Sequence, residues 1–141
     1  MHVMQAGLVK RFTFIPMLTA PDDTGQGGRT DRSQARAGTR NTELVAFLDG
    51  CLDNNKRDIK ELAGFFAGEG IEAAIYRREF THRQRREYFE QIDNGLLSAA
   101  LIFIDPDVGL EVQQSGEKHL LYSEIKGLYQ RMDLSSILML Y

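Results

Sequence analysis

The sequence has little cysteine and no long apolar run. Its single cysteine, Cys51, cannot form a disulfide within the chain, and a four-cysteine zinc site is excluded. The longest apolar stretches fall far short of the roughly 20 residues of a membrane-spanning helix, so we expect no membrane partner. The first residues lack the basic and apolar blocks of a secretion signal. Because nothing requires an oxidising compartment, we expect a cytoplasmic protein.

A strong net charge is also lacking, since the formal value is −3 at neutral pH. This balance predicts no overall attraction to nucleic acid. Nine of the 17 lysines and arginines nevertheless lie in two stretches, and all nine are arginine. The first stretch spans 29–40, and the second consists of Arg77, Arg78, Arg83, Arg85 and Arg86. Arginine suits phosphate well, so the second stretch is a candidate nucleic-acid-binding surface, with a solvated loop and a polar helix face as the alternative interpretation.

The apolar residues that are present alternate between strand-like and helix-like spacing. Strands are predicted at 11–18, 71–76, 99–104 and 136–141, with a short extended run at 119–122. Helices are predicted from Asn41 or Thr42 to about Asp53, from about Asp58 to Gly68, from Thr81 to about Asp93, and from Ser123 to about Met132. This alternation predicts one α/β domain over 1–141, with a Rossmann-like, largely parallel sheet flanked by helices.

Two of the predicted strands are informative about the sheet. The segment 99–104, AALIFI, is apolar on both faces, as expected of a central parallel strand covered by helices on each side. The segment 136–141 is predicted as another buried strand, and the sequence stops inside it. We therefore expect an incomplete domain, truncated at 141, whose exposed strand edge favours a homodimer.

The first candidate site follows the strand 99–104. Asp105 comes directly after it, where open α/β folds bind ligands at the carboxyl edge of the sheet. Pro106 stiffens the chain, and Asp107 and Glu111 bring further carboxylates. Asp105, Asp107 and Glu111 are therefore the candidate catalytic residues, able to orient an amine, hold a divalent metal or act as a base. An acid-rich turn that caps backbone amides is the alternative.

A long polar segment at about 20–41 follows the first predicted strand. Its glycines Gly25, Gly27 and Gly28 are candidate cofactor-binding residues, because such a turn lets a cofactor approach the backbone. Their spacing matches neither the dinucleotide-binding nor the phosphate-loop pattern, so a flexible loop is the competing interpretation.

A metal-dependent nuclease is a third functional alternative. Pro106-Asp107 followed by Glu124-Ile125-Lys126 imitates the Pro-Asp…Glu-x-Lys pattern of such enzymes, in which the acids hold the metal. Here, however, Glu124 and Lys126 fall in a predicted helix, whereas those enzymes carry them on a strand. The three histidines show no metal-ligand spacing, and no metal ligand is assigned.

Several segments together resemble a group of uncharacterised bacterial and phage proteins that carry an Asp-Pro-Asp-Asn-Gly-Leu-Glu motif. The matching segments are FIDPDVGLE, EKHLLYSEIKGLY, ILMLY, the stretch Gly27–Thr30 and the stretch Arg57–Phe66. Val108 stands where that group has asparagine. The resemblance covers most of the chain and supports the α/β fold.

The chain also resembles, more distantly, S-adenosylmethionine-dependent methyltransferases that modify amino groups of nucleic-acid bases. In those enzymes a central strand ends in Asp-Pro-Pro-Tyr or a relative, and Asp105-Pro106 occupies that place. The resemblance implies that Asp105 orients the acceptor, Asp107 and Glu111 shape the pocket, and the arginines of 77–86 contact a phosphate backbone. It implies S-adenosylmethionine as cofactor and nucleic acid as partner. A non-enzymatic module that binds nucleic acid or protein is the rival hypothesis.

Overall fold

A computed structural model describes residues 7, 9–19, 41–56 and 58–141. The predicted cofactor residues Gly25, Gly27 and Gly28, and the whole first arginine stretch at 29–40, lie outside the described residues. Within the described part of the chain, no helix has the length and apolar character needed to cross a membrane.

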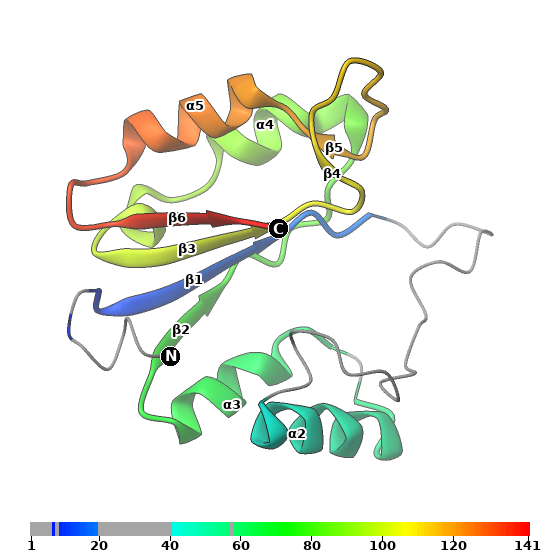
Figure 1. Ribbon diagram of the computed structural model, residues 1–141, viewed down its shortest axis with the longest axis vertical. Helices are drawn as coiled ribbons and strands as arrows, with labels where there is room; N and C mark the ends of the chain where they lie inside the picture. Colours follow the sequence, from blue (N-terminus) through cyan, green and yellow to red (C-terminus); the bar gives the residue numbers. More distant parts are fainter. Residues whose placement is uncertain (1–6, 8, 20–40, 57) are drawn as a thin grey trace.

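The centre of the structure is a parallel sheet of four strands in the order β2-β1-β3-β6 (Figure 1). Its strands are β1 (Arg11–Pro16), β2 (Glu72–Ile75), β3 (Ala100–Asp105) and β6 (Ile137–Leu140). A second, two-stranded parallel pair joins β4 (Gly109–Leu110) to β5 (His119–Leu120). The predicted α/β class with a largely parallel sheet is confirmed.

Helices flank this sheet on both faces (Figure 1). One face carries α2 (Thr42–Asp53) and α3 (Glu61–Gly68), and the other carries α4 (Arg85–Glu90) and α5 (Tyr122–Arg131). Short 3-10 helices, η3 (His82–Gln84) and η4 (Asn94–Leu97), adjoin α4. Asn41 caps α2 as predicted, because its side chain accepts a hydrogen bond from the amide of Leu44 at 2.9 Å.

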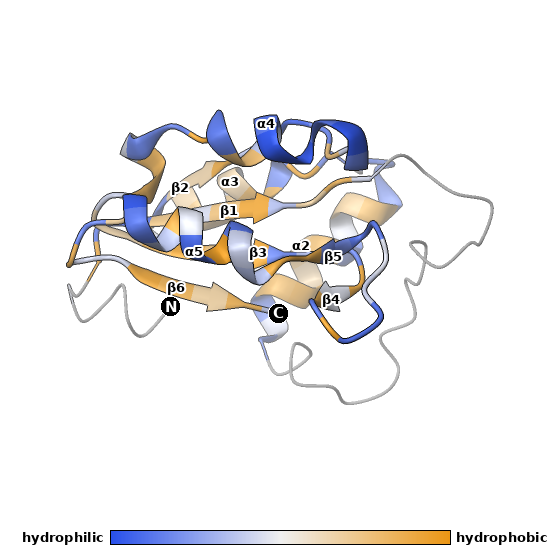
Figure 2. Ribbon diagram, turned by 90° about the horizontal axis from the view of Figure 1, so that it is seen from above, coloured by the Kyte–Doolittle hydropathy of each residue, from blue (hydrophilic) through white to orange (hydrophobic). Residues whose placement is uncertain are grey.

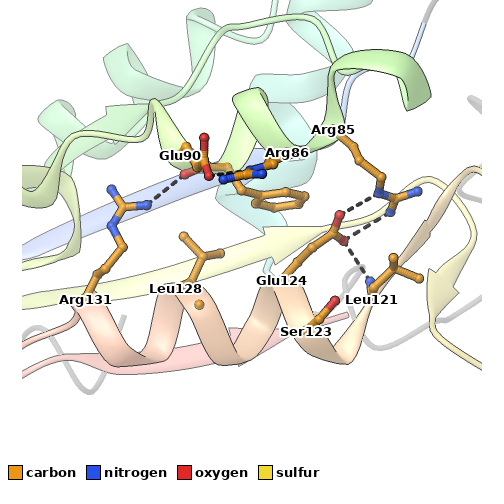
Figure 3. A pocket seen from close by; sticks show the side chains of 10 residues that line it. Arg85, Arg86, Glu90, Leu121, Ser123, Glu124, Leu128 and Arg131 are labelled. Atoms are coloured by element: carbon orange, nitrogen blue, oxygen red, sulfur yellow. Dashed lines mark hydrogen bonds and ion pairs between the residues drawn. The ribbon is translucent and has the colours of Figure 1, made fainter.

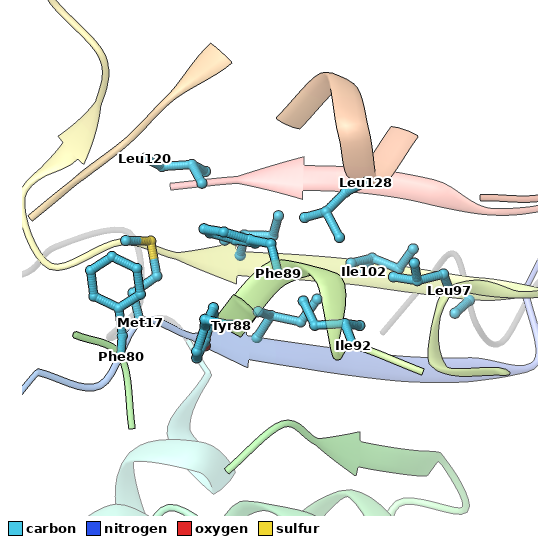
Figure 4. Close-up of a cluster of buried hydrophobic side chains, with 12 residues drawn as sticks. Met17, Phe80, Tyr88, Phe89, Ile92, Leu97, Ile102, Leu120 and Leu128 are labelled. Carbon is cyan, nitrogen blue, oxygen red and sulfur yellow. The ribbon is translucent and has the colours of Figure 1, made fainter. Parts of the chain in front are cut away.

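The main hydrophobic core lies between the sheet and the helices α4 and α5 (Figure 4). Alternate residues of the central strands point into it, as the two-residue period of a strand requires. Hydropathy follows the same division, with hydrophobic strands and a hydrophilic α4 (Figure 2). The fully or nearly fully buried members include Ile15, Tyr88, Phe89, Ile92, Ile102, Ile104 and Leu128. The helical spacing of α4 and α5 indicates that Phe89, Ile92 and Leu128 face inward, and they are buried, whereas Tyr129, which the same spacing allows inward, is exposed.

The other face of the sheet is only partly covered, which corrects two predictions. Phe66 of α3 packs on Phe12 of β1, with ring centroids 4.7 Å apart. The neighbouring residues of β3 on this face, Leu101 and Phe103, are only half-buried, so β3 is not sealed on both sides as predicted. The strand β6 was predicted as buried, but it lies at the edge of the sheet and alternates between exposed and half-buried residues.

Two helix boundaries also differ from the predictions. The helix predicted from Thr81 to Asp93 is divided into η3 and the shorter α4, and Asp93 begins a separate turn by accepting a hydrogen bond from the amide of Gly95 at 2.6 Å. The helix α5 begins one residue before its predicted cap, Ser123. Its start is instead stabilised by Glu124, whose carboxylate accepts a hydrogen bond from the amide of Leu121 at 2.9 Å.

Asp133 joins two loops at the amino edge of the sheet. Its carboxylate accepts hydrogen bonds from the hydroxyls of Ser98, Ser135 and Ser136. It also accepts one from the amide of Ala99, at 2.9 Å. Ala99 has a φ of +50°, a left-handed conformation that is unfavourable for alanine. The bonds from Ser98, Ser136 and Ser135 hold the pKa of the Asp133 carboxyl well below its ordinary value of 3.8.

We expect Asp133→Asn to lower the melting temperature at neutral pH. An acid whose pKa is lower in the folded state stabilises the fold above its ordinary pKa, and loses that contribution as the pH falls through the folded-state value. The difference in melting temperature between wild type and variant should therefore shrink below about pH 3.8. Thermal melts across this range measure it, with Asp53→Asn, an exposed acid at the end of α2, as the control. Equal melting temperatures at neutral pH would contradict this role.

Candidate ligand site at the carboxyl ends of β1 and β3

The strand order of the sheet reverses between β1 and β3, its two central strands. From β1 the chain passes through α2 and α3 to β2 on one side, and it then crosses to β3 on the other side and continues outward to β6. The connections that follow β1 and β3 therefore leave the sheet in opposite directions. Open α/β folds bind ligands in the crevice that such a switch creates at the carboxyl ends of the strands. The topology thus predicts a site next to Pro16 and Asp105, the last residues of these strands.

Asp105 lies at this point, as the sequence predicts. It is paired in register with Pro16, and its carbonyl oxygen accepts a hydrogen bond from the amide of Met17 at 3.0 Å. The side chain is half-buried, and no described residue gives its carboxylate a hydrogen bond or an ion pair. Burial raises the pKa of the Asp105 carboxyl, and the nearby charge of Asp107 raises it further. The result is a carboxylate with unused acceptor capacity and increased basicity.

Asp107, two residues further on, is held by its neighbours. Its carboxylate accepts a hydrogen bond from the hydroxyl of Thr19 at 3.0 Å and forms an ion pair with the ammonium group of Lys118 at 3.0 Å. These contacts join the segment that follows β1 to the loop that precedes β5. Asp107 therefore holds the two segments beside Asp105 together, and the pocket-shaping role that the resemblance implies stays a prediction.

Glu111 has a different position from the one predicted. Its carboxylate accepts a hydrogen bond from the amide of Tyr122, the first residue of α5, at 2.8 Å. Among the described residues, Asp105, Asp107 and Glu111 do not gather closely enough to hold a metal ion together. Gly109, which precedes it, has a φ of +124°, which a side chain would strain. Glu111 therefore caps α5, and the structure does not bring it together with the two aspartates.

The arginines of the second stretch are mostly paired with acids. Each pair joins an arginine to a nearby acid: Arg77 to Asp58 at 3.4 Å, Arg78 to Glu87 at 3.1 Å, and Arg86 to Glu90 at 2.7 Å. The side chain of Arg86 is nevertheless 89% exposed, and Arg83 is also exposed. Exposed pairs of this kind are weak, so a phosphate can replace the acid. The nucleic-acid contact of these arginines stays a prediction.

Arg85 is an exception, because it is a structural residue. Its guanidinium forms a two-point ion pair with Glu124, with nitrogen–oxygen distances of 2.5 and 3.1 Å, and the two side chains are only 15% and 10% exposed. It also donates to the carbonyl oxygen of His119 at 2.8 Å and lies over the ring of Phe80. Arg85 thus connects α4 to β5 and α5, in place of the phosphate contact predicted for it.

A pocket between α4 and α5 was missed by the sequence analysis (Figure 3). Its volume is about 380 Å³. Phe89, Leu128 and Gly127 contribute apolar surface, and Arg86, Glu90 and Arg131 lie around them. The sequence signal was Gly127, which leaves a gap in the middle of α5. The guanidinium of Arg131 is occupied by the carbonyl oxygens of Phe89 and Ile92, so the pocket does not present it as an unpaired cation.

The nuclease alternative depends on Glu124 and Lys126, which lie in α5 as predicted. Both carboxylate oxygens of Glu124 are engaged, one with Arg85 alone and the other with Arg85 and the amide of Leu121. Within the ranges that the structure describes, no three His, Cys, Asp or Glu side chains gather closely enough to hold a metal ion. Comparison of the whole chain with protein-family models, with curated proteins and with solved structures finds no match.

Proposed function

We propose that this protein is a methyltransferase-like α/β domain that acts on an amino group of nucleic acid at the carboxyl ends of β1 and β3. The observation that supports this proposal is Asp105, a half-buried carboxylate without a described hydrogen-bond donor, at the switch point of the sheet. An amino group donates two hydrogen bonds and is the natural complement of such an acceptor.

In this proposal each residue of the site has a distinct task. Asp105 accepts a hydrogen bond from the acceptor amine and so fixes the direction of the nitrogen lone pair. Its raised pKa makes it the better acceptor of that bond and of the proton that the amine later loses. Asp107, held by Thr19 and Lys118, keeps the loop beside it in place.

The described residues include a candidate group for the acceptor amine but none of the residues predicted to bind the methyl donor. S-adenosylmethionine would supply the methyl group when bound. The described residues provide the acceptor side through Asp105, whereas the candidate donor residues Gly25, Gly27 and Gly28 lie outside the described residues. The resemblance of Asp105-Pro106 to the strand-end motif of base-modifying methyltransferases is what favours methyl transfer over other chemistry of an amine.

Nucleic acid is the proposed acceptor because exposed arginines lie at the same edge of the sheet as Asp105. Arg77 follows the carboxyl end of β2, and Arg83 belongs to η3 beyond it. Their guanidinium groups suit phosphate oxygens, which position a duplex or a single strand without reading its sequence.

The test compares wild type with Asp105→Asn, which keeps the size of the side chain and removes its charge. We expect wild type to bind S-adenosylmethionine in a calorimetric titration and to transfer labelled methyl groups to nucleic acid. The variant should lose about 100-fold or more in kcat/KM with little change in donor affinity, since proton acceptance contributes about 100-fold to 10,000-fold. Asp53→Asn is the control. Absence of donor binding and transfer in wild type would refute methyl transfer.

The same protein samples also distinguish the enzyme hypothesis from its rival, a binding module without enzymatic activity. If wild type binds nucleic acid without donor binding, the logarithm of its affinity should fall steeply with the logarithm of the salt concentration. Arg83→Ala should then reduce that slope, while Asp105→Asn leaves it unchanged.

A further inference from the structure

The outer edge of β6 is apolar and lacks the features that usually protect such an edge. β6 pairs with β3 on one side and with no described strand on the other. Exposed edges are commonly protected by lysine, proline or a bulge. The stretch 134–141, LSSILMLY, contains no proline and no charged residue of either sign. Ile137, Met139 and Tyr141 on this strand and just after it are exposed, by 40%, 43% and 84%.

Alternate residues of β6 direct their backbone amide and carbonyl groups away from β3, where another strand can pair with them. The amide of Tyr141 bonds to the carbonyl oxygen of Ile104 in β3, at 3.3 Å. Because polar groups alternate sides along a strand, those of Ile137 and Met139 also face β3, and those of Leu138 and Leu140 face outward. The edge therefore presents two amides and two carbonyl oxygens.

We propose that this edge binds a second copy of the same chain, with the two β6 strands antiparallel about a two-fold axis at Met139. In that register Leu138 lies opposite Leu140 of the partner copy, and their outward amides and carbonyl oxygens satisfy one another in four hydrogen bonds. Ile137 lies opposite Tyr141 of the partner copy, and the two Met139 side chains meet on the axis. The two sheets become one continuous sheet.

A second copy suits this edge better than an unrelated peptide for two reasons. The strand is self-complementary about Met139, since every residue from 137 to 141 meets an apolar residue and no charges approach one another. The exposed parts of Ile137, Met139 and Tyr141 amount to roughly 300 Å² per copy, at about 200 Å² for a large side chain. With the strand backbone added, this is at the small end of specific interfaces, below roughly 600 Å² per partner. The dimer should therefore dissociate reversibly in the micromolar range.

The first experiment uses charge at the two-fold axis. Wild type should change from monomer to dimer with rising concentration in sedimentation velocity. Met139→Lys and Met139→Glu should each be monomeric, because each places like charges opposite one another. An equal mixture of the two should dimerise again. Val112→Lys, at another exposed apolar residue, is the control and should behave as wild type. A monomeric wild type at every concentration, or a mixture that stays monomeric, would overturn the proposal.

The second experiment tests the register. Directly opposed residues without mutual hydrogen bonds have Cα atoms about 4.5 Å apart, within the range of a disulfide. In a Cys51→Ser background, Met139→Cys should therefore cross-link two chains rapidly under mild oxidation. Leu134→Cys, on a fully exposed residue before β6, is the control and should cross-link slowly. Equal rates for the two variants would exclude pairing about Met139.

Discussion

Arg85→Ala should destabilise the protein by about 3–5 kcal/mol, because removing one partner of a buried ion pair leaves the other charge uncompensated. Glu124, the residue left behind, is only 10% exposed in the folded protein, so its charge has lost most of its solvation by water. The substitution also removes the hydrogen bond to the carbonyl oxygen of His119, so the start of β5 loses its connection to α4. Chemical denaturation followed by circular dichroism measures the loss.

Arg86→Ala is the matched control for this prediction. Arg86 is the next residue of the same helix and also forms an ion pair, with Glu90 at 2.7 Å, but its side chain is 89% exposed. Exposed pairs one helical turn apart contribute about 0.3–0.5 kcal/mol. If both variants lose the same small free energy of unfolding, the Arg85–Glu124 pair does not have the structural role assigned to it.

Tyr88→Ala should destabilise the fold by about 3–5 kcal/mol, the usual loss for a large buried aromatic residue. Tyr88 is fully buried between α4 and the sheet and packs edge-on against Phe80 and Tyr76. Its hydroxyl donates a hydrogen bond to the carbonyl oxygen of Pro16 at 2.6 Å. Burial also raises the pKa of Tyr88, so the hydroxyl keeps its proton and remains a donor.

Tyr88→Phe separates the hydrogen bond from the packing. It keeps the ring and leaves the carbonyl oxygen of Pro16 without its donor, so a loss of about 1–3 kcal/mol is expected. Tyr129→Ala on α5 is the control, because that side chain is exposed and a loss within about 0.5 kcal/mol is expected. Equilibrium unfolding should rank the three variants in this order, and a Tyr88→Ala variant as stable as Tyr129→Ala would contradict the packing described here.

The elements of the fold were largely predictable because their signals are local. The apolar run that became β3 and the capped, periodic helix α2 both formed as predicted. Exposure was less predictable. Whether β6 is central or at an edge depends on its neighbours, and four apolar residues in a row read the same in either position.

In the candidate site, too, features that depend on neighbouring residues could be predicted, and contacts between residues distant in sequence could not. Asp105 could be placed at the carboxyl edge because it directly follows a strand. Its separation from Glu111 could not be predicted, because six residues of sequence do not reveal that Glu111 turns towards α5. The structural role of Arg85 was also hidden, since its partner Glu124 lies 39 residues further along the chain.

The two central strands of the sheet, β1 and β3, are far apart in the sequence, which has a consequence for synthesis on the ribosome. Phe14 of β1 is paired in register with Phe103 of β3, so one flank of β1 has no partner until the residues between them and β3 itself have been made. At about 5–20 residues per second, those intervening residues take roughly 5–20 seconds to translate. During that interval the nascent chain exposes an apolar strand without its main neighbour. Such a chain is a substrate for chaperones and can aggregate before it folds.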